Sequence, residues 1–107
     1  SKKAFDTVMN RNGINRSVSI QADVNTYDLA TLGELCFVLL DVDLYRPMKK
    51  CLKELYTILT PNGIMIVDDC NEKDMAWDGS YQAYKEFMQE IGQPVEIVLG
   101  KLGIIRK

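Results

Sequence analysis

Two short runs of apolar residues constrain the fold of this chain more than any other feature. The first covers residues 36–40 (Cys-Phe-Val-Leu-Leu) and ends at Asp41, and the second covers residues 64–67 (Ile-Met-Ile-Val) and ends at Asp68. Uninterrupted apolar runs of about four to eight residues are typical of strands buried on both faces, as in parallel sheets. Two parallel strands need a crossover connection, which is usually a helix. The sequence therefore predicts a strand, a helix and a second strand over this region.

Helical periodicity fills the segment between the two runs. The apolar side chains that recur there at helical spacing are Met48, Cys51, Leu52, Leu55, Tyr56 and Leu59. Pro47 suits the first turn of such a helix, and residues 60–63 (Thr-Pro-Asn-Gly) predict a turn at its end. A second helix is predicted over residues 81–91, and residues 95–99 and 102–105 predict a terminal β-hairpin.

The N-terminal third gives weaker signals. Residues 3–12 place Phe5, Val8 and Met9 on one helical face, and residues 17–22 alternate apolar and polar side chains. We interpret these segments as a helix and a short strand. The polar segment 71–79 is predicted to be a loop, and Trp77 within it is either a wall of a substrate site or an anchor for the loop.

The alternation of strands and helices predicts an α/β fold. With 107 residues the chain forms one domain at most. Its sheet should be doubly wound and mostly parallel, with an antiparallel hairpin at the C-terminus and helices on both faces. Ligands of such sheets bind beyond the carboxyl ends of the strands.

The composition excludes several functions. The chain has no histidine, which rules out Ser-His, Cys-His and His-metal chemistry. Its 13 basic and 15 acidic residues are scattered, so nucleic acid is not an expected partner. We expect a cytoplasmic protein without membrane partners, because no apolar run approaches the about 18 residues of a membrane span. Cys36, Cys51 and Cys70 are predicted to be reduced packing residues.

Four carboxylates, those of Asp41, Asp43, Asp68 and Asp69, follow the two predicted strands. At one sheet edge they would repel one another unless a positive charge lies between them. A divalent cation would supply it, and oxygen-only ligands favour Mg²⁺, Ca²⁺ or Mn²⁺ over zinc. Acids also follow strands for ordinary reasons, and Asp43 is close enough to Pro47 to cap the next helix. Tyr45 either contacts a ligand or covers the sheet edge.

Residues 41–45 (Asp-Val-Asp-Leu-Tyr) and 59–69 (Leu-Thr-Pro-Asn-Gly-Ile-Met-Ile-Val-Asp-Asp) resemble the macrocin O-methyltransferase family. Those enzymes are class I, S-adenosylmethionine-dependent methyltransferases with Rossmann-like sheets, and their comparable segments are roughly Asp-Gly-Asp-Leu-Tyr and Leu-Ser-Pro-Gly-Gly-aliphatic-Asp-Asp. The resemblance covers residues 37–70 well. Val42 replaces the usual glycine of the first motif, and Asn62 replaces the first glycine of the second.

The resemblance implies a site and an activity. Magnesium ligands carry over to Asp41, Asp68 and Asp69, and Asp43 is a second ligand from the first motif or the general base. Asp41 and Asp43 can exchange these roles, and Asp41 and Tyr45 are the residues expected to contact the cofactor. The implied reaction is direct methyl transfer, in which Mg²⁺ orients and acidifies a sugar or catechol-like hydroxyl that attacks the sulfonium methyl.

One part of the family pattern is missing. Class I methyltransferases hold the cofactor with a glycine-rich turn after the first strand, whereas Gly13 and Gly33 are isolated here. We therefore expect residues 1–107 to be the C-terminal part of a single methyltransferase-like domain. In the family's sheet order two strands would separate residues 17–22 from residues 36–40, and the unpaired edges would invite a homodimer.

Two other functions stay open. The missing glycine-rich turn favours a non-catalytic fragment or interaction module that does not bind the cofactor alone. A phosphoryl-transfer or response-regulator-like domain would also gather Asp residues at strand ends. It fits less well, because no acid pair precedes Asp41 and no matching lysine follows a later strand.

Overall fold

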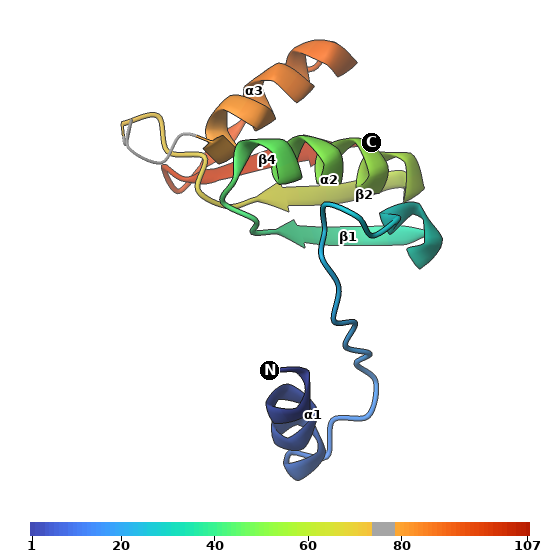
Figure 1. Ribbon diagram of the computed structural model, residues 1–107. Coiled ribbons are helices and arrows are strands. Elements are labelled where there is room, and N and C mark those ends of the chain that lie inside the picture. The colour runs from blue at the N-terminus through green and yellow to red at the C-terminus, as the bar shows by residue number, and fades with distance from the viewer. Residues whose placement is uncertain (74–78) are drawn as a thin grey trace.

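A four-stranded mixed sheet with two helices on one face forms the core of the protein (Figure 1). The computed structural model describes residues 1–73 and 79–107, so Trp77 and part of the predicted loop 71–79 lie outside the described residues. In chain order the elements are α1 (Lys2–Arg11), η1 (Leu29–Leu32), β1 (Leu35–Leu40), α2 (Tyr45–Ile58), β2 (Leu59–Val67), α3 (Gly79–Ile91), β3 (Ile97–Val98) and β4 (Leu102–Arg106). The predicted α/β fold class is confirmed.

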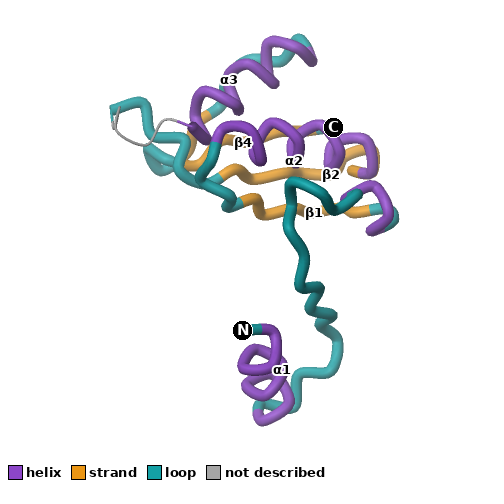
Figure 2. Tube along the Cα trace, viewed as in Figure 1, coloured by secondary structure: helices purple, strands orange, loops and turns teal. Residues whose placement is uncertain are grey.

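The strands lie in the order β1-β2-β4-β3 (Figure 2). Strands β1 and β2 are parallel and are connected through α2, whereas β4 runs antiparallel to β2 and β3 and forms the predicted terminal hairpin. Leu40 pairs with Val67 at the carboxyl ends of β1 and β2. The residues that follow the two strands therefore leave the sheet side by side.

The core lies between the sheet and helices α2 and α3. Alternation along the strands directs Val38 and Leu40 of β1, and Met65 and Val67 of β2, toward the helices. The helical members of the same cluster are Met48, Cys51, Leu52, Leu55, Ala83, Tyr84, Phe87 and Met88. Their spacing explains why α2 and the predicted helix at 81–91 form as amphipathic helices.

Tyr84 ties α3 to the hairpin. Its side chain is fully buried, and its hydroxyl accepts a hydrogen bond from the Glu96 amide at 3.0 Å. The same hydroxyl lies 2.9 Å from the Ile104 carbonyl, to which it donates. A buried hydroxyl needs such partners, because an unpaired polar group costs free energy when it leaves water. The contacts fix α3 over the end of the sheet that carries the strand-end acids.

Among residues 1–73 and 79–107, no helix packs closely on the other face of the sheet. Phe37 and Leu39 of β1 point to this face and are 57% and 63% exposed. In Figure 1 helix α1 lies beyond the β1 edge and is separated from the sheet, and it contains no buried residue. Helices α2 and α3 pack against the sheet.

Two local predictions were wrong. Residues 17–22 form no strand, and Val18 is 86% exposed, so the alternation there has no sheet to join. Residues 60–63 lie inside β2 and not in a turn after α2. The register between β1 and β2 shifts there, and Asn62 adopts a left-handed φ of 67°, so the segment is a bulge in the strand.

Two other expectations can be compared with the structure. None of the helices that the structure describes is long and apolar enough to cross a membrane. The three cysteines are free, and Cys51 and Cys70 are buried as predicted for packing residues. The prediction was wrong for Cys36, which is exposed because it lies near the start of the edge strand β1.

Candidate functional site

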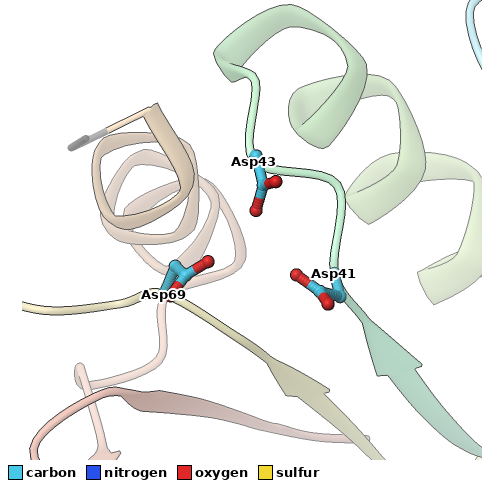
Figure 3. A group of neighbouring side chains, drawn as sticks. All are labelled: Asp41, Asp43 and Asp69. Atoms are coloured by element: carbon cyan, nitrogen blue, oxygen red, sulfur yellow. The ribbon is translucent and has the colours of Figure 1, made fainter.

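Three carboxylates converge beyond the ends of β1 and β2. They belong to Asp41, Asp43 and Asp69, and one oxygen from each lies within 4.8 Å of the others. Figure 3 shows the side chains pointing toward one another across the gap between the two strands. All three residues are exposed, so the group is open to ligands and solvent. We call this group the acidic triad.

Backbone hydrogen bonds set the positions of the triad. The Asp68 amide donates to the Leu40 carbonyl at 2.9 Å, which continues the parallel ladder one residue beyond the sheet. The Leu44 amide donates to the Val42 carbonyl at 2.8 Å, closing a three-residue turn around Asp43. The first bond holds the two acid-bearing segments next to each other, and the second fixes the turn that carries Asp43.

Two members of the triad have unusual backbone angles. Asp43 has a φ of 66° and Asp69 a φ of 57°. Left-handed angles are uncommon for residues other than glycine, although Asp and Asn tolerate them better than most. Strained residues of this kind concentrate at functional sites, where the surrounding structure holds them in place. The two positive φ angles therefore support a functional interpretation of the triad.

Gly79 allows α3 to begin directly against the triad loop. A Cβ atom at this position would lie 3.0 Å from the Asp43 carbonyl oxygen and 3.0 Å from the Tyr45 amide nitrogen. Both neighbours are backbone atoms and cannot move aside cheaply. The first turn of α3 is thus packed onto the loop that carries Asp43.

The neighbouring carboxylates disturb the protonation of Asp43. The pKa of Asp43 is raised, mainly by hydrogen bonding with Asp69, then by loss of hydration and by the negative charge of Asp41. A neighbouring carboxylate favours the protonated form because two like charges repel. A cation bound within the triad would relieve this repulsion.

We expect Asp43→Asn to raise the thermal stability of the cation-free chain at neutral pH. Because the pKa of Asp43 is raised in the folded state, folding is favoured when this carboxyl is protonated, and that advantage is lost as the pH rises through the raised value. Asn is uncharged and tolerates the left-handed backbone. Thermal unfolding by circular dichroism should show the gain at neutral pH and none below the ordinary Asp pKa. A less stable variant at neutral pH would contradict the repulsion.

Asp68 lies apart from the triad. Its Oδ1 accepts the Asp69 amide at 2.8 Å and lies 3.2 Å from Lys101 Nζ. The Asp69 amide is the main cause that lowers the pKa of Asp68, and Lys101 adds to it. Of the three predicted magnesium ligands, the structure brings together Asp41 and Asp69, with Asp43 beside them. The metal-binding roles of all these residues stay predictions.

The alternative role considered for Asp43 was to cap the helix that follows. The N-cap of α2 is Leu44, and no side chain makes a capping hydrogen bond there. Asp43 is therefore not a helix cap, and its carboxylate points toward Asp41 and Asp69 instead (Figure 3).

Tyr45, a predicted cofactor contact, connects the two helices. Its hydroxyl donates to Glu86 Oε2 of α3 at 2.6 Å. Lys49 of α2 pairs with Glu90 of α3 at 3.1 Å in the same area. The Tyr45 hydroxyl thus joins α2 to α3, and both roles considered for Tyr45, contacting a ligand and covering the sheet edge, stay predictions.

Cys70, which follows β2, and Lys101, in the turn before β4, lie next to the strand-end acids. Cys70 follows Asp69, and burial raises the pKa of its thiol to about 12, so it carries no charge at neutral pH. Lys101 was not singled out in the sequence. Its place depends on the antiparallel pairing of β4 with β2, which brings the turn before β4 to the carboxyl end of β2 and which the sequence did not predict.

Comparison with solved structures shows which known proteins share the fold of this chain. No protein-family model matches the chain, and no curated protein matches it. The apo structure of CalS11, a TDP-rhamnose 3'-O-methyltransferase of calicheamicin biosynthesis, matches 81% of this chain with a TM-score of 0.62 and 20% identity. A crystal structure of CalS11, a calicheamicin methyltransferase, matches 81% of this chain with a TM-score of 0.63 and 20% identity.

This chain spans 39% and 36% of the two matched chains. At 20% identity the likeness establishes a shared fold. The chain therefore shares the fold of these two methyltransferase structures, whereas its own activity and its membership of the macrocin type stay predictions.

Proposed function

We propose that this chain supplies the metal-binding and acceptor-binding side of an S-adenosylmethionine-dependent O-methyltransferase. The observation that carries the proposal is the acidic triad, in which Asp41 and Asp69 follow adjacent parallel strands and meet Asp43 within 4.8 Å. Open α/β sheets bind their ligands at this edge. The shared fold with CalS11 supports methyl transfer as the reaction class.

The triad fits a magnesium ion by its donor chemistry. Mg²⁺ prefers oxygen ligands and is usually held by one or two carboxylates, with water and substrate completing its shell. Asp41 and Asp69 are the proposed ligands, and Asp68 is a further one. When bound, the ion would lower the pKa of the acceptor hydroxyl and orient it.

The residues of the chain have separate roles in this proposal. The acceptor is a small molecule with a free hydroxyl, such as a sugar. Asp43 would take the proton of the acceptor hydroxyl at its carboxylate, and Asp41 is the alternative for this role. S-adenosylmethionine would supply the methyl group to the acceptor oxygen and would leave as the neutral thioether. Tyr45 and Asp41 are the proposed contacts to S-adenosylmethionine.

A second function is favoured by the uncovered side of the sheet. Strand β1 is at a sheet edge, and its Phe37 and Leu39 are exposed. Unpaired edges and apolar faces promote association. The alternative proposal is a non-catalytic interaction module that forms a homodimer through the β1 edge and does not bind the cofactor alone.

Calorimetric titration of S-adenosylmethionine into the chain, with and without Mg²⁺, distinguishes the two functions. Binding with a defined stoichiometry is expected for the enzyme. A folded chain that binds no cofactor and dimerises with rising concentration in sedimentation experiments would instead support the interaction module.

A further inference from the structure

Lys101 occupies a fixed position beside the ends of the strands. It follows Gly100 in the turn between β3 and β4, and its carbonyl accepts the Cys70 amide at 2.7 Å. Its own amide donates to the Val98 carbonyl at 3.2 Å. Because both bonds hold the backbone of residue 101, the lysine side chain starts from a defined point next to Asp68.

The ammonium group of Lys101 lies beside the carboxylate of Asp68. Its Nζ is 3.2 Å from Asp68 Oδ1. This ion pair joins the turn between β3 and β4 to the residue that follows β2.

The pairing explains the placement of Asp68. Asp68 neighbours Asp69 in the chain, yet its carboxylate contacts Lys101 and the Asp69 amide, and it is not a member of the triad. A carboxylate attracts a metal ion less strongly while an ammonium group next to it neutralises its negative charge. For Asp68 to become a ligand, the contact with Lys101 has to be broken or weakened.

We propose that Lys101 is a built-in counter-ion that competes with the divalent cation for Asp68. This inference rests on the proposed metal site of the acidic triad. In the cation-free protein Lys101 pairs with Asp68. The acidic triad is then exposed and available to bind the cation. When the cation binds, Asp68 exchanges the Lys101 ammonium for the cation. Lys101 is thus a positioning residue that sets the affinity of the site.

The expected size of the effect follows from the exposure of the pair. The side chains of Lys101 and Asp68 are 54% and 23% exposed. Exposed and partly exposed ion pairs contribute little, so loss of the competing lysine should tighten cation binding by about 2- to 5-fold. Added salt should reduce the difference, because it screens exposed charges.

Calorimetric titration of Mg²⁺ into five forms of the chain tests the competition. They are the wild type, Lys101→Gln, Lys101→Arg, Asp68→Asn and the double variant Asp68→Asn with Lys101→Gln. We expect Lys101→Gln to bind Mg²⁺ about 2- to 5-fold more tightly than the wild type, and Lys101→Arg to match the wild type because it keeps the charge. In the Asp68→Asn background, Lys101→Gln should have no effect.

Four results would overturn the inference. An equal gain in the Asp68→Asn background would mean that Lys101 acts through its general field and not through Asp68. Weaker binding by Lys101→Gln would mean that the lysine assists the site. Equal affinities of Lys101→Gln and wild type would overturn the competition alone. Absence of Mg²⁺ binding in every form would overturn the proposed metal site together with this inference.

Discussion

We expect the replacement of Asp69 by Asn to lower the proposed Mg²⁺-dependent methyl transfer by at least about 100-fold, because a proposed ligand of the ion is lost and even outer partners of metal ligands are worth about 10- to 100-fold. The substitution removes a charge and keeps the shape of the side chain. Asn also accepts the left-handed φ of 57° at this position, so the fold should be retained. Methyl transfer from labelled S-adenosylmethionine to a panel of sugar and catechol hydroxyls measures the loss.

Asp28→Asn is the matched control for this prediction. Asp28 caps the short helix η1 by accepting the Ala30 amide at 3.1 Å, and Asn can form the same bond. The control changes the net charge by the same amount but leaves the acidic triad intact, so it should keep the wild-type rate. If Asp69→Asn also kept the wild-type rate, Asp69 would have no part in the reaction.

Leu40→Ala should destabilise the chain by about 2–5 kcal/mol, the usual cost of truncating a buried leucine. Leu40 is 6% exposed and packs into the core beneath α2. Its neighbour Leu39 is 63% exposed on the other face of β1, so Leu39→Ala removes the same atoms and should cost less than about 0.5 kcal/mol. Urea unfolding of the two variants measures the difference directly.

The comparison also tests which face of the sheet is covered. Similar losses for both leucines would contradict an open face at Phe37 and Leu39. A large loss for Leu39→Ala that grows with protein concentration would indicate that a second copy covers this face in solution. That result would favour the interaction module over the enzyme.

Most of the fold could be predicted from local signals. The apolar runs of β1 and β2 and the helical spacing of α2 are visible in short windows of sequence. Residues 17–22 show the limit of such signals, since alternation predicts a strand only where another strand pairs with it. Residues 60–63 contain turn residues, yet they form a bulge in β2 because Asn62 and Gly63 pair with Lys107 at the other end of the chain.

The candidate site could be predicted only in outline. The rule that parallel strands end at one sheet edge was sufficient to bring Asp41 and Asp69 together. It could not decide between Asp43 and Asp68 as their neighbour. That choice depends on the left-handed backbone at Asp43 and on Lys101, which arrives from a hairpin more than thirty residues later. Side-chain direction and long-range charge pairs are not encoded in local patterns.

Titration of Mg²⁺ into the wild-type chain, followed by calorimetry at low ionic strength, tests the central claim most directly. The account predicts saturable binding of one ion per chain, lost in Asp69→Asn and retained in Asp28→Asn. Absence of heat in a chain that circular dichroism shows to be folded, or equal binding by the wild type and Asp69→Asn, would contradict a metal site at the ends of β1 and β2.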